Sequence, residues 1–310
     1  MKLAFVFPGQ GSQAVGMMAG YAHHPVVRET FAEASEVLGQ DLWALVTADS
    51  DGALDRTVNT QPVMLAAGIA VWRAWQAAGG MRPDIVAGHS LGEYSALVAA
   101  GALAFRDALP LVRFRAQAMQ DAVPAGVGAM AAVMGIDEAG IAAACAEAAQ
   151  GQVVEAVNFN APGQIVIAGH AEAVERAIAA AKARGARRGV LLPVSAPFHS
   201  SLMKPAALRL AERLASVTIA TPLIPVLHNA DVMTHSEPEA IRAALARQAA
   251  SPVRWVETVQ AFAARGVARS FECGPGRVLT GLSKRIAPTI EGLALDDGDG
   301  IDAARAALAA

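Results

Sequence analysis

Short runs of apolar residues alternate along most of the chain with longer stretches in which apolar positions recur at helical spacing. The first pattern is typical of strands that are buried on both faces, and the second of amphipathic helices. Their alternation predicts a parallel sheet covered by helices. The predicted strands include residues 3–7 and 84–87, and the predicted helices span residues 27–38, 61–77, 93–100 and 106–121. Pro62 is expected to open the second of these helices.

The pattern changes between residues 127 and 195, where four strand-like runs and two helical stretches follow one another in the order βαββαβ. Asp137 precedes the first of these helices and is expected to cap it. The strands are predicted at residues 128–136, 153–159, 164–169 and 189–195, and the helices at 137–149 and 171–185. This order is that of the ferredoxin-like split βαβ unit, so residues 127–195 are predicted to form a small subdomain inserted into a larger body.

Composition excludes several classes of protein. Hydrophobic residues make up 54% of the 310 residues and charged residues 17%, which excludes disorder as the main state. The net charge of -3 provides no general attraction to nucleic acid. Because neither a signal peptide nor an apolar run of membrane-spanning length is recognisable, we expect a soluble, cytoplasmic protein that does not bind membranes. Cys145 and Cys273 lack the spacing of a disulfide framework or a zinc site, so we expect buried thiols and no metal.

The glycines of the opening stretch "FVFPGQGSQA" raise one functional possibility. Gly9, Gly11 and Ala14 fit the dinucleotide fingerprint G-x-G-x-x-G/A, and Glu33 and Glu36 lie near the distance of a ribose-binding acid. However, Pro8 occupies the place where the tight strand-to-helix turn should begin. A dinucleotide-binding protein therefore stays as an alternative, which tight binding of NAD would favour.

Residues 88–92, Gly-His-Ser-Leu-Gly, match G-x-S-x-G between a predicted strand and a predicted helix. This context indicates a nucleophile elbow, in which the two glycines allow a sharp turn that exposes the hydroxyl of Ser90. The N–H of Leu91 and the positive end of the helix would then face an oxyanion formed on a Ser90 ester. The alternative is an ordinary turn with a capping serine. The elbow leads us to expect an α/β-hydrolase-like catalytic body, residues 1–126 and 196–310.

A nucleophilic serine needs a base within hydrogen-bond reach, and the chain has seven histidines. Most lie in predicted polar loops or caps, and the side chain of His89 should point away from that of Ser90. His199 and His228 remain. His199 lies in a loop where the inserted unit rejoins the body, a position typical of active sites, and is favoured over His228 without excluding it.

Arg115 lies on the apolar face of its predicted helix, which it shares with Met119. The helix after Ser90 extends about ten residues, or ~15 Å, away from the serine. If the next helix is antiparallel to it, the nine residues up to Arg115 return ~14 Å, which brings Arg115 level with Ser90. A buried arginine needs an anion. The partner is either an internal Asp or Glu or a carboxylate that arrives with the substrate. The second possibility predicts transfer of a dicarboxylic half-acyl group.

Eight stretches of the sequence, in this order, resemble the malonyl-CoA:acyl carrier protein transacylases of fatty acid synthesis. They are "FVFPGQGSQ", "TQP", "GHSLGEYSALVAAG", "RAQAMQ", "NFNAPGQIVIAG", "APFHSSLMKPA", "QAASPVRW" and "FECGPGRVLTGLSKRI". The resemblance covers essentially the whole chain and implies a malonyl transferase with acyl carrier protein and malonyl-CoA as partners. It implies no cofactor, since coenzyme A is part of a substrate, and we expect a monomer.

The resemblance also implies roles for single residues. Ser90 is similar to the acylated nucleophile of the family and His199 to its general base, which is oriented by the main-chain carbonyl of Gln248. Gln10 and Leu91 match the two residues whose N–H groups form the oxyanion hole. The expected substrate-binding residues are Arg115, which pairs with the malonyl carboxylate, the bulky Phe198, Met119 and Gln61.

Two further expectations concern substrates. Phosphates of coenzyme A and the acidic carrier protein would meet exposed cations, for which the candidates are Arg187, Arg188, Lys204, Lys284 and Arg285. The reaction is expected to be ping-pong, through a malonyl-serine. A serine hydrolase would use the same elbow, and turnover of simple thioesters without an acceptor thiol would favour that alternative.

Overall fold

The first strand, β1 (Lys2–Phe7), is buried along most of its length because helices cover both faces of its sheet. Leu3, Phe5 and Phe7 belong to one hydrophobic core, whereas Ala4 and Val6, which point to the opposite face, belong to another. This two-sided burial explains why the strand reads as a continuous apolar run. The computed structural model describes residues 1–49 and 51–309.

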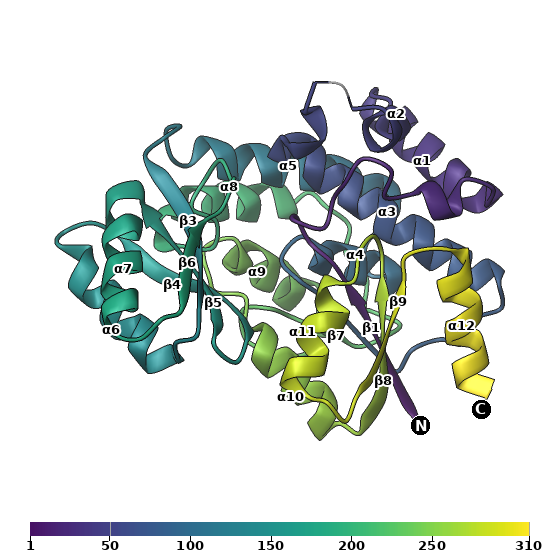
Figure 1. Cartoon of the computed structure of the whole chain (residues 1–310). Helices are drawn as coiled ribbons and strands as arrows, with labels where there is room; N and C mark the ends of the chain where they lie inside the picture. The colour runs from purple at the N-terminus through teal and green to yellow at the C-terminus, as the bar shows by residue number, and fades with distance from the viewer. Residues whose placement is uncertain (50, 310) are drawn as a thin grey trace.

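Five parallel strands form the larger sheet, with β1 in the middle (Figure 1). Their order across the sheet is β7 (Val226–Leu227), β2 (Ile85–Gly88), β1, β8 (Val267–Cys273) and β9 (Glu291–Leu295). Because β1 and β2 are parallel neighbours, their carboxyl ends lie side by side. The opening glycines follow β1 and Ser90 follows β2, so the two stretches meet at the same edge of the sheet.

Helices form a layer on each face of this sheet. One core contains residues of α3, α4 and α5, and the core on the other face contains residues of α10 and α11. The helices of the body are α1 (Pro25–Leu38), α2 (Leu42–Thr47), α3 (Thr57–Ala77), α4 (Gly92–Ala99), α5 (Phe105–Asp121), α8 (Lys204–Leu214), α9 (Pro238–Gln248), α10 (Trp255–Ala264), α11 (Val278–Ile286) and α12 (Gly298–Ala309). Short 3₁₀ turns occupy Ala19–Tyr21, Ala53–Asp55 and Ser201–Met203. Within the described ranges, none of the helices is both long enough and apolar enough to cross a membrane.

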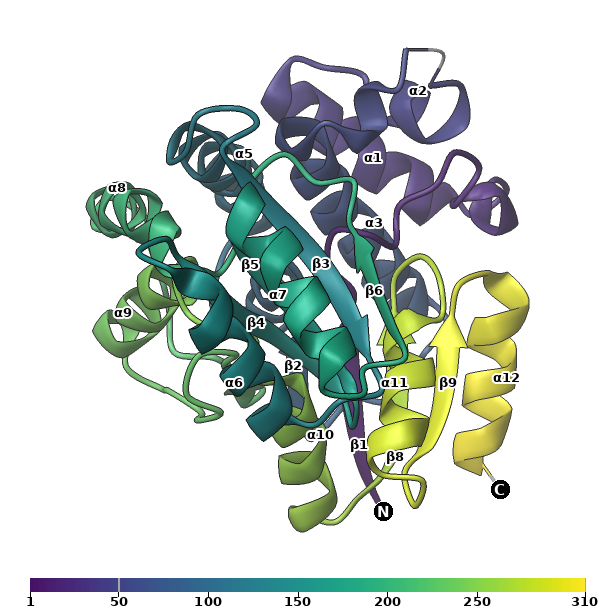
Figure 2. The ribbon, with the colours of Figure 1, turned by 60° about the vertical axis from the view of Figure 1, so that its left-hand side comes forward.

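The smaller sheet has four antiparallel strands, packed on one face against α6 (Glu138–Ala149) and α7 (Ala171–Ala183) (Figure 2). Its order is β4 (Val154–Ala161), β5 (Gln164–His170), β3 (Gly128–Met134) and β6 (Arg188–Leu191). Asp137 caps α6, as predicted, by accepting the N–H of Gly140 at 2.8 Å. The predicted α/β class, with a parallel sheet and a separate antiparallel subdomain, is confirmed. The boundaries at 126/127 and 195/196 stay a prediction.

Several predicted element boundaries differ from the structure, and the two largest differences, of four residues each, involve prolines. Helix α3 begins at Thr57, four residues before the predicted start, and Pro62 lies inside it. In the first turn the Thr60 hydroxyl donates to the carbonyl oxygens of Leu54 (2.6 Å) and Arg56 (3.1 Å). Pro62 has no N–H and so removes one donor from the hydrogen-bond ladder of the helix. Strand β6 ends at Leu191 and not at residue 195, because Pro193 has no N–H to donate to a neighbouring strand.

Strand β4 connects the subdomain to the body of the molecule. The N–H of Phe159 donates to the carbonyl of Val253 (3.0 Å), and the N–H of Val253 donates to the carbonyl of Val157 (2.8 Å). The Asn160 side chain contacts His89 at 2.8 Å, and the Glu155 carboxylate accepts the N–H of Ser201 at 2.7 Å. One strand of the subdomain therefore contacts three separate loops of the body.

Candidate active site

Ser90 lies in a sharp turn between β2 and α4 and has a φ of 52°, a left-handed value that is costly for a residue with a side chain. Glycine is required on both sides. A Cβ on Gly88 would lie 1.8 Å from the carbonyl carbon of Gly92, and one on Gly92 would lie 2.0 Å from the carbonyl oxygen of Phe7. The turn, packed this closely against the end of β1, holds the Ser90 hydroxyl above the carboxyl edge of the sheet.

His199 contacts the serine directly. Its Nε2 lies 2.7 Å from Ser90 Oγ, and its Nδ1 lies 3.0 Å from the main-chain oxygen of Gln248. Since a carbonyl oxygen can only accept, Nδ1 carries the proton and Nε2 is free to accept the proton of Ser90. His199 is buried and, like Ser90, has a positive φ, of 66°. Nucleophile and base are thus both held in strained backbone conformations.

The other histidine that the sequence left open lies elsewhere. His228 is fully buried, with its Nδ1 2.7 Å from a Glu93 carboxylate oxygen. His89 contacts Asn160 with its Nε2, which directs its ring away from the Ser90 hydroxyl, as expected. Of the histidines considered, only His199 is hydrogen-bonded to the serine.

The electrostatic surroundings keep His199 uncharged. Burial, followed by the positive charge of Arg115, lowers the pKa of His199 to about 3. The imidazole is therefore a base near neutral pH and not a cation.

Arg115 enters the site from α5 and is 1% exposed. Its Nη2 donates to Ser90 Oγ (3.1 Å) and to Gln248 Oε1 (2.9 Å), and its Nη1 donates to Gln61 Oε1 (2.8 Å). The guanidinium also lies 5.5 Å from the centre of the Tyr94 ring. In the described part of the chain, its hydrogen-bond partners are neutral and its Nε has none. The alternative of a salt bridge to an internal Asp or Glu is therefore not observed, and the site holds a buried cation without a bonded anion.

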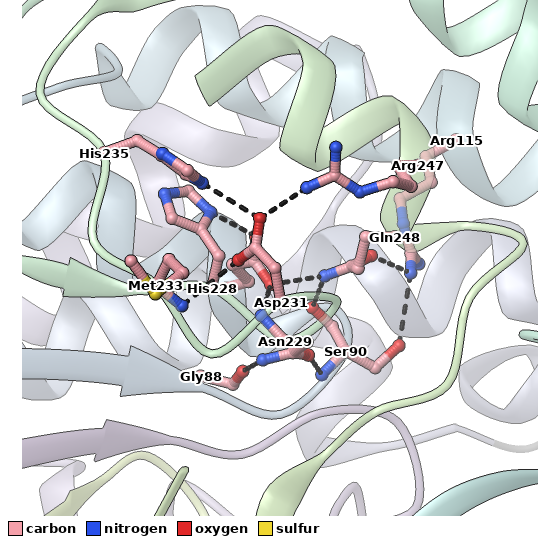
Figure 3. A network of polar contacts seen from close by, with 11 residues as sticks. Gly88, Ser90, Arg115, His228, Asn229, Asp231, Met233, His235, Arg247 and Gln248 are labelled. Carbon is pink, nitrogen blue, oxygen red and sulfur yellow. Dashed lines mark hydrogen bonds and ion pairs between the residues drawn. The ribbon is translucent and has the colours of Figure 1, made fainter. Parts of the chain in front are cut away.

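The Gln248 side chain makes hydrogen bonds that the sequence did not predict (Figure 3). Besides the main-chain contact to His199, its side chain accepts from Arg115 and donates from Nε2 to the carbonyl of Ser90 (2.8 Å) and to Glu93 (3.0 Å). A single glutamine at the end of α9 thus contacts the serine, the histidine and the arginine.

The proposed oxyanion donors lie at the meeting point of β1 and the elbow. A Cβ on Gly9 would lie 2.5 Å from the carbonyl oxygen of His89 and 3.7 Å from the nitrogen of Leu91, which brings the next residue, Gln10, against the turn. Gly11 has a φ of +105°. Neither the N–H of Gln10 nor that of Leu91 has a hydrogen-bond partner among the described residues. Both are available to a ligand.

These side chains surround a cavity of about 100 Å³. Eight of the nine residues predicted for the site line it, and Gln248 lies behind it. The sequence missed the contribution of the subdomain, which adds Met130, Asn158, Leu192 and Val194. Their apolar or amide side chains in ordinary strand patterns gave no chemical signal.

Other predicted candidates lie outside the cavity. Glu33 and Glu36, the possible ribose-binding acids, pair with Arg73 (2.7 Å) and Arg106 (3.2 Å). This pairing disfavours the dinucleotide alternative. The five candidate cations, Arg187, Arg188, Lys204, Lys284 and Arg285, are all exposed, and their role stays a prediction. Nowhere in residues 1–49 and 51–309 are three or more His, Cys, Asp or Glu side chains arranged to hold a metal ion.

Known proteins resemble this chain along nearly all of its length. A family model described as "Acyl transferase domain" matches residues 4–285. A malonyl CoA-acyl carrier protein transacylase of Escherichia coli strain K12 is 56% identical over 304 residues, which are 98% of each chain. The crystal structure of an acyl-carrier-protein S-malonyltransferase from Burkholderia pseudomallei is 59% identical with a TM-score of 0.97, covering 99% of this chain and 100% of that one. A malonyl-transacylase in complex with its type II PKS acyl-carrier protein is 53% identical with a TM-score of 0.98, covering 99% and 100%.

Proposed function

This chain belongs to the acyl transferase domain family, among its malonyl-CoA–acyl carrier protein transacylases, and we propose how its site moves the malonyl group. The enzyme transfers malonyl from malonyl-CoA to acyl carrier protein. We propose that Ser90 holds the malonyl group as an ester between the two thiols. The observation that supports this proposal is the position of Ser90 Oγ, 2.7 Å from a neutral imidazole and 3.1 Å from a buried guanidinium.

In the first half-reaction, His199 Nε2 takes the proton of Ser90 while Oγ attacks the thioester carbonyl. The negative charge that forms on the carbonyl oxygen is stabilised by the N–H groups of Gln10 and Leu91. The carbon–sulfur bond then breaks, and the coenzyme A thiolate leaves with the proton from His199. The thiol of the carrier protein repeats these steps in reverse and releases free Ser90.

Arg115 selects the acyl group in this scheme. The malonyl carboxylate replaces the Ser90 hydroxyl as an acceptor of the guanidinium, so the buried cation obtains its anion from the substrate. The Ser90 oxygen then no longer accepts from Arg115, so a lone pair becomes available for attack while the hydroxyl proton stays directed at His199. Neutralising the cation also removes part of the field that lowers the pKa of His199, which makes the base stronger when the correct substrate is bound. Phe198, Met119 and Gln61 line the same cavity and limit its size.

Incubation with malonyl-CoA is expected to add the mass of one malonyl group to the intact protein, on Ser90. The adduct should disappear when holo carrier protein is added, because its thiol accepts the group, and Ser90→Ala should form none. Mass spectrometry of the intact protein and of its peptides makes the measurement. Failure of the wild-type chain to form a covalent adduct, with transfer still occurring, would contradict the proposal, and release of free malonate at the rate of ester formation would indicate a hydrolase.

The rate of Ser90 acylation is expected to fall in acid only at pH values well below the usual pKa range of histidine. For an imidazole with a pKa of about 6.5, the uncharged fraction falls roughly 25-fold between about pH 7 and pH 5. His199, with its pKa lowered to about 3, stays uncharged over this interval, so the initial rate of acylation by acetyl-CoA should change little. Acetyl-CoA is the suitable donor because it leaves Arg115 unneutralised. Arg115→Gln should raise the pH at which the acylation rate begins to fall. A wild-type acylation rate that falls to half near pH 6.5 would refute this explanation.

We also propose a cytoplasmic location. Cys145 and Cys273 are both free, buried thiols, as is usual for proteins of a reducing compartment.

A further inference from the structure

A group of fully buried polar side chains lies directly behind the nucleophile (Figure 3). Glu93, His228, Asn229 and Gln248 each have 0% of their surface exposed. Burying a carboxylate costs several kcal/mol unless donors surround it. Glu93 has three: His228 Nδ1 at 2.7 Å, the N–H of Asn229 at 2.9 Å and Gln248 Nε2 at 3.0 Å. Burial of the Glu93 carboxylate therefore costs little free energy as long as all three donors are present.

The contacts of this group converge on the main chain of Ser90. Asn229 Oδ1 accepts the N–H of Ser90 at 2.7 Å, and Asn229 Nδ2 donates to the carbonyl of Gly88 at 2.7 Å. Gln248 Nε2 donates to the carbonyl of Ser90 at 2.8 Å. Both main-chain polar groups of the serine are thus held by side chains, and one amide spans the turn from Gly88 to Ser90.

The left-handed backbone of Ser90 explains why these contacts are needed. A non-glycine residue with a left-handed backbone costs about 1–3 kcal/mol and persists only when its surroundings fix it. Ser90 has this conformation, and a relaxed turn would move its hydroxyl away from His199 Nε2 and from the oxyanion donors.

We propose that Asn229 and Glu93 are positioning residues for the transfer reaction: Asn229 fixes the turn that presents Ser90, and Glu93 fixes Asn229 and Gln248. Through Gln248, Glu93 also places the carbonyl that orients His199 and the oxygen that accepts from Arg115. One buried carboxylate therefore aligns the nucleophile, the base and the substrate-binding cation without touching the substrate. The inference rests on the proposed role of Ser90.

The two positions should differ in their kinetic effects. The Asn229 side chain is hydrogen-bonded only to the turn, so Asn229→Ala should slow the acylation of Ser90 by about 100-fold, the loss typical of a displaced catalytic group, with the KM for malonyl-CoA unchanged. Glu93→Ala should lower kcat and also raise KM, because Gln248 and with it Arg115 lose their support. Single-turnover acylation and steady-state transfer measure the two quantities.

Glu93→Gln is the conservative variant. Its amide oxygen can accept from Asn229 and Gln248 as the carboxylate does, and its NH₂ can donate to His228 Nδ1 once the His228 proton moves to Nε2. That Nε2 has no partner among the described residues, so it can carry the proton without breaking a hydrogen bond. Glu93→Gln is therefore expected to regain most of the acylation rate that Glu93→Ala loses.

Glu272 provides a matched control. It is a second fully buried carboxylate, which accepts the N–H groups of Leu279 (3.0 Å) and Thr280 (2.7 Å) and has no contact with the serine turn. Glu272→Ala should lower the melting temperature and leave the acylation rate constant of the folded protein as it is. Should Asn229→Ala lose its cooperative thermal transition, Asn229→Ser carries the same expectation, since its shorter side chain cannot reach both Gly88 and Ser90.

Two results would overturn the inference. One is acylation at the wild-type rate in the folded Asn229 variants. The other is a loss of rate in Glu272→Ala equal to that in Asn229→Ala at the same melting temperature. The wild-type adduct on Ser90 is measured first: its absence refutes the nucleophile itself, whereas its presence together with either result refutes only the roles of Asn229 and Glu93.

Discussion

Replacing Arg115 by alanine is expected to abolish most malonyl transfer while acetyl loading of Ser90 stays the same or becomes faster. Truncating one partner of a buried, hydrogen-bonded charge pair costs about 2–5 kcal/mol, or roughly 30-fold to several thousand-fold in kcat/KM for malonyl-CoA. Acetyl-CoA has no carboxylate to lose. It should instead gain from a site in which the cation no longer lowers the pKa of His199.

A competition assay with malonyl-CoA and acetyl-CoA measures this reversal of preference directly. Arg113→Ala is the matched control, because Arg113 lies on the same helix but donates to the carbonyl of Leu38 (3.1 Å) and to Gln40, outside the cavity. Its preference should equal that of the wild type. Unchanged malonyl kinetics in Arg115→Ala would refute the carboxylate-binding role, and an equal loss for both donors would indicate a structural one.

His199→Ala is expected to lower the transfer rate by about 10⁴-fold, the upper range for removal of a general base. Without the imidazole, the Ser90 proton has no acceptor within reach, and Arg115 Nη2 remains as a donor that stabilises the resting hydroxyl. The KM for malonyl-CoA should change much less than kcat, since the guanidinium is still present.

Stopped-flow or quenched-flow acylation with malonyl-CoA measures the effect. His170→Ala serves as the control, because His170 Nδ1 accepts the N–H of Val153 (3.0 Å) within the subdomain and does not line the cavity. A His199→Ala variant with a tenth or more of the wild-type rate would show that another group removes the proton.

Local features of the site could be predicted from sequence because they depend on regular geometry. Two glycines flanking a serine between a strand and a helix specify the turn at Ser90. The constant rise of two antiparallel helices was enough to place Arg115 beside Ser90, and the observed 3.1 Å contact agrees with that estimate.

Contacts between distant segments could not be predicted from the residues alone. His199 is 109 positions from Ser90, and its place depends on how the inserted subdomain returns the chain, so local patterns favoured it over His228 only slightly. The Gln248 side chain and Asn229 approach Ser90 from still farther away. Glu93 was the one available signal, since a carboxylate within the apolar stretch "EYSALVAAG" needs donors.

The bridging contacts of β4 have a consequence for protein engineering. A chimera that takes residues 127–195 from a relative would import a new wall for the acyl cavity, including Met130 and Leu192, and so could alter which acyl chains fit. The same exchange replaces Glu155, Val157, Phe159 and Asn160, whose partners Ser201, Val253 and His89 stay with the recipient. The chimera must therefore preserve these pairs, or also take the three contacting loops from the relative, so that the turn at Ser90 keeps its conformation beside the new cavity wall.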